Sequence, residues 1–143
     1  MASVSELLDR FVEEFNRGRF EAALEDYAEG GIQEEIGTGR RLTPQEAVEN
    51  ARAWKAAFPD AQGTVETKLV DGDRGAAEIL WTGTNTGSLM GQPPTGKRVT
   101  MRAVVVVETA EGKITRARNY LDIAGLMAQL GAGAASAADS GGR

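Results

Sequence analysis

The sequence predicts an α+β domain in which helices in the first half cover one face of a curved antiparallel sheet formed by the second half. Before Pro59, apolar residues recur every three or four positions, which is typical of amphipathic helices. After Pro59 the repeat shortens to two and β-branched residues become frequent, which is typical of strands. A length of 143 residues corresponds to a single domain.

The first two predicted helices form a corner. A capping box at Ser3 opens the first helix, which ends at Gly18. The second helix is shorter and runs from Phe20 to Gly30. A short strand is predicted over residues 32–36, before the third helix begins.

Two further helices complete the helical part of the prediction. Thr43 opens the third helix with a second capping box that has proline at the first helical position. A short helix over residues 123–130 follows the last strand, and Asp122 is its expected N-cap. The domain is therefore expected to span residues 1–131, whereas the Gly/Ala/Ser tail over 132–143 is expected to be disordered.

Four long strands are predicted as a meander, near residues 63–70, 75–84, 98–109 and 114–121. Their alternation separates two faces of the sheet. The face expected against the helices is apolar and carries Val65, Leu69, Ile79, Trp81, Val99, Met101, Ala103, Val105, Val107, Thr115, Ala117, Asn119 and Leu121. The opposite face is expected to be a solvated or intersubunit ladder of ion pairs that includes Glu66, Lys68, Glu78, Arg98, Arg102, Arg116 and Arg118.

The composition limits the possible partners. With 41% hydrophobic and 26% charged residues, the chain has the composition of a soluble globular domain. A net charge of -5 disfavours a nucleic-acid partner. No apolar run approaches the roughly 20 residues needed to cross a bilayer, and the first residues do not resemble a signal peptide, so we expect no membrane partner and a cytoplasmic protein.

The chain contains neither cysteine nor histidine. This excludes disulfides, cysteine nucleophiles, Ser-His-Asp triads and nearly all zinc sites, and we expect neither a metal nor a cofactor. Acid–base chemistry must then use a carboxylate, a lysine or a tyrosine, or an oriented amide and water.

Several short segments carry a family resemblance. The block GQPPTG at residues 91–96 follows GTNTG at 83–87 and precedes EGKI at 111–114 and RNYLD at 118–122. Their order and spacing resemble the SnoaL-like polyketide cyclase family over about residues 5 to 131. The resemblance implies a cone-shaped barrel of the nuclear-transport-factor-like kind, with a deep apolar pocket between helices and sheet, in a homo-oligomer such as a dimer or tetramer.

The resemblance also implies where site residues lie. The acid/base aspartate of the family corresponds to Asn119, its assisting histidine to Val105, and its pocket asparagine to Gln33. An amide orients a carbonyl or a water but cannot take a proton at neutral pH. Glu35 shares strand parity with Gln33 and is therefore the candidate proton acceptor.

Each candidate has a plainer interpretation. Asn119 is either a substrate-orienting amide or a core amide satisfied by backbone or water. Glu35 lies either in the pocket or at a solvated strand edge. The side chains predicted to contact a ligand either wall a planar molecule or simply fill the core. They are Phe15, Tyr27, Trp54, Phe58, Trp81, Met90, Ala103 and Val105.

The leading hypothesis is a small enzyme of secondary metabolism, such as antibiotic biosynthesis, acting on an apolar or aromatic polyketide-like molecule that carries carbonyl groups. It would promote cyclisation or isomerisation without a metal, with Asn119 and Gln33 orienting oxygens and Glu35 moving the proton. The alternatives are a non-catalytic small-molecule-binding or assembly module and a hydroxylase relative within the family. A Glu35 carboxylate that shares a cavity with Asn119 favours an enzyme, whereas Glu35 in solvent favours a binder.

Overall fold

The computed structural model describes residues 1–131, so the predicted tail over 132–143 lies outside the described residues. The helices are α1 (Val4–Asn16), the short 3-10 helix η1 (Phe20–Ala22), α2 (Ala23–Asp26), α3 (Pro44–Ala57) and α4 (Ile123–Leu130). The strands are β1 (Tyr27–Ile36), β2 (Arg40–Leu42), β3 (Gln62–Asp71), β4 (Arg74–Thr84), β5 (Arg98–Ala110) and β6 (Lys113–Leu121). No helix in this part of the chain is long and apolar enough to cross a membrane.

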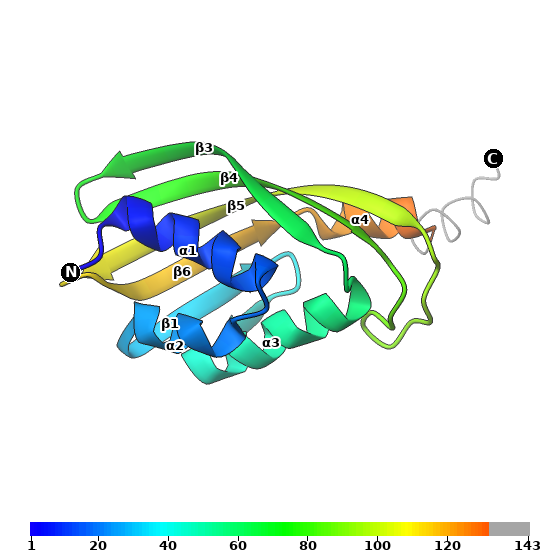
Figure 1. Ribbon diagram of the computed structural model, residues 1–143, viewed down its shortest axis with the longest axis horizontal. Coiled ribbons are helices and arrows are strands. Elements are labelled where there is room, and N and C mark those ends of the chain that lie inside the picture. Colours follow the sequence, from blue (N-terminus) through cyan, green and yellow to red (C-terminus); the bar gives the residue numbers. More distant parts are fainter. Residues whose placement is uncertain (132–143) are drawn as a thin grey trace.

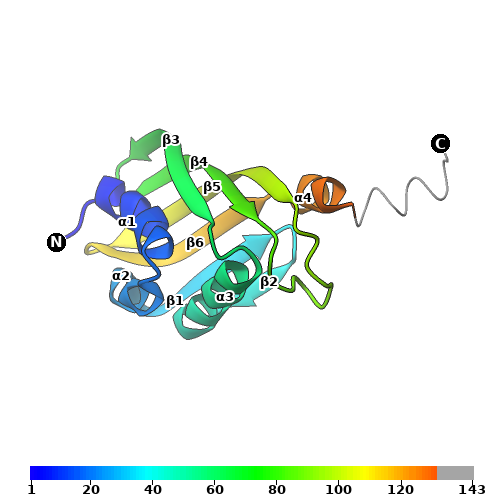
Figure 2. The same ribbon diagram turned by 45° about the vertical axis from the view of Figure 1, so that its right-hand side comes forward.

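The strands form one curved sheet in the order β2-β1-β6-β5-β4-β3, and α1, α2 and α3 lie on the same side of it (Figures 1 and 2). The α+β class is therefore confirmed. The sheet is mixed rather than wholly antiparallel, because β1 runs parallel to β6, the last strand of the meander. It also remains open, with β2 and β3 at its edges, so the cone is not a closed barrel.

The second predicted helix is shorter than expected. Helix α2 ends at Asp26, and Gly30 and Gly31 lie inside β1 instead of ending a helix. The register with β6 shifts between Tyr27 and Ile32, and Gly30 has φ 76°, so the glycines form a β-bulge. Glycine is equally suited to a helix end and to a bulge, which is why the sequence pattern is ambiguous here.

Helix α1 closes one end of the core. Its capping box is confirmed, because the Ser3 hydroxyl accepts from the Glu6 backbone N–H and the Glu6 carboxylate accepts from the Ser3 N–H. The apolar stripe of α1 packs on the sheet, where Val105 is fully buried. The N-caps predicted at Thr43 and Asp122 are also present.

A second bulge changes the predicted faces of the sheet. The register between β3 and β4 shifts between Val65 and Thr67, which reverses the parity of the rest of β3. Lys68 therefore turns toward α1, where its Nζ lies 2.8 Å from Asp9 Oδ2, and Leu69 turns outward and is 67% exposed.

The outer face carries ion pairs, as predicted. Arg102 pairs with Glu66 at 3.0 Å. Arg116 pairs with Glu34 across β6 and β1 at 2.7 Å. Exposed pairs of this kind contribute little to stability.

Candidate functional site

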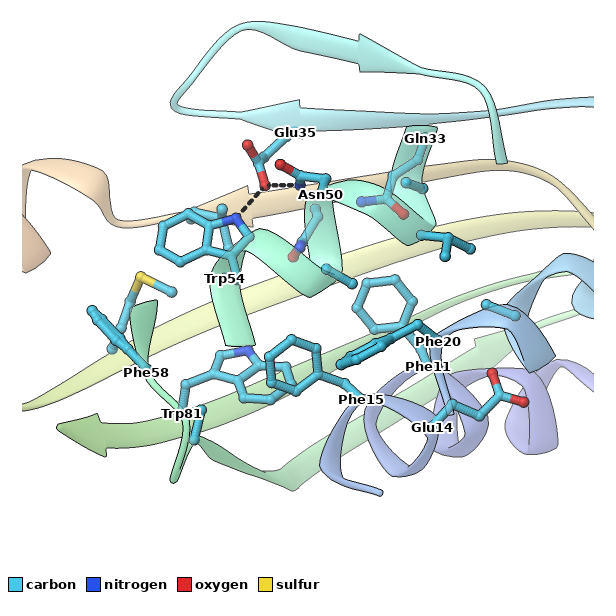
Figure 3. A pocket seen from close by; sticks show the side chains of 18 of the residues that line it. Phe11, Glu14, Phe15, Phe20, Gln33, Glu35, Asn50, Trp54, Phe58 and Trp81 are labelled. Carbon is cyan, nitrogen blue, oxygen red and sulfur yellow. Dashed lines mark hydrogen bonds between the residues drawn. The ribbon is translucent and has the colours of Figure 1, made fainter. Parts of the chain in front are cut away.

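A cavity lies between the helices and the concave face of the sheet (Figure 3). Most of its wall is aromatic or aliphatic, with few polar side chains, which is the usual character of a small-molecule site. The carboxyl and carboxamide side chains of its wall are Glu14, Asp26, Gln33, Glu35, Asn50 and Asn119.

The three predicted polar residues are brought together in this wall. Gln33 and Glu35 alternate on β1, and both are buried. Asn119 on β6 is the direct register partner of Glu35. The parallel pairing of β1 with β6 thus places a carboxylate and an amide side by side on the helix-facing side of the sheet.

Glu35 is the most enclosed acidic residue of the cavity wall, with 2% exposure, so the solvated-edge interpretation is wrong. Its Oε2 accepts hydrogen bonds from Asn50 Nδ2 at 2.7 Å and from Trp54 Nε1 at 2.9 Å (Figure 3). Its Oε1 accepts one from the Thr38 hydroxyl at 2.7 Å. Three neutral donors therefore satisfy a buried carboxylate without neutralising its charge.

Local structure explains how these donors reach Glu35. Asn50 and Trp54 are four residues apart and so lie on the same face of α3. Thr38 lies in the turn between β1 and β2, where Gly37 and Gly39 both have positive φ and fold the chain back over the strand end.

Asn119 Oδ1 is buried and has no hydrogen-bond partner among the described residues. The interpretation of Asn119 as a core amide satisfied by the protein backbone therefore does not hold. An unpaired buried carbonyl of this kind costs about 1–3 kcal/mol, which a ligand hydroxyl or a water would recover.

Gln33 is oriented by Tyr27, whose hydroxyl donates to Gln33 Oε1 at 2.9 Å. Burial raises the pKa of Tyr27 above its ordinary value, so the tyrosine stays a neutral donor. Because the carbonyl end of the Gln33 amide is thus occupied, its nitrogen is the end that can serve a ligand.

Five of the eight predicted ligand contacts line the cavity: Phe15, Tyr27, Trp54, Phe58 and Trp81. Phe11 and Phe20, which the sequence analysis did not select, line it as well. The rings pack edge to face, with the centroid of Phe15 4.9 Å from that of Trp81 and 5.8 Å from that of Phe20.

The other three predicted contacts are not in the cavity wall. Met90 is 52% exposed in the loop between β4 and β5 and has a positive φ of 49°. Ala103 and Val105 are 3% and 0% exposed, but they are buried within the protein core. Val105 is covered by the apolar stripe of α1, so the position that corresponds to the family's histidine does not open into the cavity here.

Two further carboxyl groups of the cavity wall are Glu14 on α1, which lies apart from Glu35 (Figure 3), and Asp26 on α2. Asp26 is 6% exposed and accepts from Arg10 Nη1 at 3.0 Å. Glu14 lies close to Asp26, and its Oε1 is buried without a hydrogen-bond partner among the described residues. Burial, reinforced by Asp26, raises the pKa of Glu14 from 4.5 to about 8.

Asn50, Thr38 and the Glu14–Asp26 pair were missed by the sequence analysis. Asn50 offered a usable signal, because it is a polar residue on a helix face shared with Ala47 and Trp54. Thr38 offered none, since a threonine between two glycines is ordinary turn composition. Among residues 1–131, no group of three or more acidic side chains converges to hold a metal ion.

The sequence and the fold match those of a family of known proteins. The family model of the SnoaL-like polyketide cyclase matches residues 6–130. The chain therefore belongs to the SnoaL-like polyketide cyclase family.

Individual relatives agree with this assignment. Aklanonic acid methyl ester cyclase DnrD of Streptomyces peucetius is 28% identical over 137 residues, which cover 92% of each chain. The crystal structure of AclR of Streptomyces galilaeus, a proposed hydroxylase, superposes with a TM-score of 0.79 at 25% identity and covers 91% of this chain and 87% of its own. A protein of Catenulispora acidiphila with a ketosteroid isomerase-like fold superposes with a TM-score of 0.77 at 15% identity over 90% of this chain and 95% of its own, which shows the fold alone.

Proposed function

We propose that the protein is a metal-free cyclase or isomerase that acts on an apolar, polyketide-like substrate carrying carbonyl groups, with Glu35 as the proton-transferring residue. The observation that carries this proposal is the buried Glu35 carboxylate, which shares the aromatic cavity with its strand neighbour Asn119. A general base must lie within reach of the substrate and start the reaction unprotonated.

The reaction can be written with these groups alone. Glu35 Oε1 takes a proton from a carbon next to a substrate carbonyl, and the electron pair of that C–H bond forms an enolate. The enolate carbon attacks a second carbonyl carbon of the same molecule, a C–C bond closes the ring, and the resulting alkoxide takes the proton back from Glu35. No oxidant is needed, and the product is an isomer of the substrate.

The side-chain amides of Gln33 and Asn119 are placed to bind the oxygen atoms of the substrate during the reaction. The nitrogen of Gln33 is free to donate to the enolate oxygen, because its carbonyl end is held by Tyr27. Asn119 Oδ1 accepts from a hydroxyl group of the substrate, which satisfies an oxygen that has no partner in the protein. The aromatic wall accommodates a planar ring system and excludes water from the enolate.

The test is turnover of aklanonic acid methyl ester, the compound that appears in the name of the relative DnrD, and of smaller diketo esters. Chromatography and mass spectrometry monitor the reaction. We expect a ring-closed product of unchanged mass. Glu35→Gln should lower the rate by about 10²- to 10⁴-fold, the range for losing a general base. The matched control is Glu34→Gln, which removes the adjacent carboxylate from the outer face and should leave turnover unchanged. Full activity of Glu35→Gln would contradict the assignment.

The same experiment separates two other functions. The likeness to AclR supports a hydroxylase as the second candidate, and a product that has gained one oxygen atom would identify it. Tight binding of the substrate by the wild-type protein without any conversion would instead identify a binding module. Both outcomes exclude Glu35 as the base of a ring closure.

A further inference from the structure

We infer that Arg40 is a positioning residue that acts through Asn50 and keeps the amide nitrogen of Asn50 directed at Glu35 throughout the reaction. This inference rests on the proposed role of Glu35. Arg40 is not among the residues that line the cavity.

The geometry is a three-residue chain of hydrogen bonds. Arg40 is the register partner of Glu35 in the β1–β2 pair, and its Nη1 donates to Asn50 Oδ1. Asn50 Nδ2 donates in turn to Glu35 Oε2 at 2.7 Å. Asn50 and Glu35 are 7% and 2% exposed, so little water reaches the bond between them, whereas Arg40 is an exposed residue.

The two ends of the Asn50 amide differ only by a rotation of about 180° around the last side-chain bond. While Glu35 is charged, its carboxylate alone favours the Nδ2 end of Asn50. After Glu35 has taken a proton, the new O–H could instead donate to Oδ1 if the amide rotated. Arg40 opposes that rotation, because the guanidinium and the amide NH2 would then face each other as two donors.

The consequence concerns which carboxylate oxygen of Glu35 carries the proton between its removal from the substrate and its return. With Asn50 Nδ2 and Trp54 Nε1 both donating to Oε2, the less occupied oxygen of Glu35 is Oε1. A proton on Oε1 remains available for return to the substrate. In the absence of Arg40 the proton can be held in a bond to Asn50, and the second half of the reaction slows.

The first test needs no substrate. Heteronuclear NMR follows the side-chain amide of Asn50 and the indole N–H of Trp54. The chain has two tryptophans, so the spectrum contains two indole signals. In Arg40→Gln we expect the Asn50 amide signal to move and broaden and the Trp54 signal to move with it. Arg40→Lys, which keeps a cationic donor, should lie between Arg40→Gln and wild type.

Arg41 provides the matched control. It is the next residue on β2, is exposed and has no side-chain hydrogen bond among the described residues, so Arg41→Gln removes the same charge without breaking the chain. The control should reproduce the wild-type Asn50 and Trp54 signals. Unchanged signals in Arg40→Gln would overturn the inference, as would equal shifts in both glutamine variants. Unchanged backbone signals from α1 show that a variant is folded. If Arg40→Gln does not fold, Arg40→Lys is compared with wild type instead.

The second test is kinetic. We expect Arg40→Gln to lower kcat by about 10- to 100-fold with KM nearly unchanged, because the substrate contacts remain and only the positioning of the base is lost. If the wild-type protein turns over no substrate, the proposed function fails and the NMR result still decides the role of Arg40. If the wild type is active and Arg40→Gln has the same kcat, the inference fails and the proposed function stands.

Discussion

Replacing Glu14 by glutamine should stabilise the protein at alkaline pH. Burial is the main cause that raises the pKa of Glu14 to about 8, the Asp26 carboxylate adds to it, and Arg10 opposes it. The unfolded chain releases this proton near pH 4.5, whereas the folded protein retains it until about pH 8. Since the raised pKa belongs to the folded state, stability falls as the pH rises through this window and is fully retained below it.

The size of the effect follows from proton linkage. Each pH unit inside the window removes at most about 1.4 kcal/mol, so the whole shift corresponds to no more than about 5 kcal/mol. Glu14 is only partly buried, and solvent screening reduces the expected loss to about 2 kcal/mol. Glutamine keeps a donor for Asp26 but carries no proton that can be lost, so Glu14→Gln should not show this decline.

Urea unfolding at pH 5 and pH 8 measures the difference. We expect wild type and Glu14→Gln to have similar free energies of unfolding at pH 5, and the variant to be more stable by about 2 kcal/mol at pH 8. Glu13→Gln, on the exposed side of the same helix, removes an equal charge and should follow wild type at both values. A Glu14→Gln protein that is less stable than wild type at pH 8 would refute the reasoning.

Three further predictions concern the ligand, the core and the assembly. Asn119→Leu should weaken binding of a planar, carbonyl-bearing aromatic compound by about 5- to 150-fold, whereas Arg102→Ala should weaken it by less than about 5-fold. Calorimetric titration measures both affinities. A larger loss in Arg102→Ala than in Asn119→Leu would place the site on the outer face. Gly63→Ala should lower the free energy of unfolding by about 1–3 kcal/mol, because the new Cβ would lie 2.6 Å from the Trp81 ring; an unchanged midpoint in thermal unfolding would contradict this. Light scattering at micromolar concentration should give the mass of a dimer or tetramer, since the outer sheet face carries ion-pairing side chains that can also pair between subunits; a monomer mass would exclude it.

The polar part of the site was predictable wherever it depended on alternation within a strand. Asn119 interrupts an apolar face of β6, and Glu35 follows Gln33 at a spacing of two, so both were placed from local patterns. Their proximity was not predictable in this way. It depends on parallel pairing between β1 and β6, which are far apart in the sequence and whose register no local pattern encodes.

The errors of prediction also have local causes. The bulge in β3 inserts one residue, and one residue is enough to exchange the two faces of a strand. Leu69 therefore lies outside although it is apolar, and Lys68 faces α1 although it is charged. Met90 is apolar within a turn-forming segment, and its exposure follows from loop geometry that periodicity does not describe.

Two glutamates line one cavity, and their surroundings decide which of them can act as the base. Burial, reinforced by the Asp26 carboxylate, raises the pKa of Glu14 to about 8, which favours its protonated form at neutral pH. Glu35 is the more buried of the two, yet its hydrogen-bond partners are an amide, an indole and a hydroxyl, all of which donate and none of which carries a charge. Such a set satisfies a carboxylate while leaving its negative charge able to attract a substrate proton. Burial alone therefore does not distinguish the two residues, and it is the uncharged donors around Glu35 on which its proposed role as the base rests.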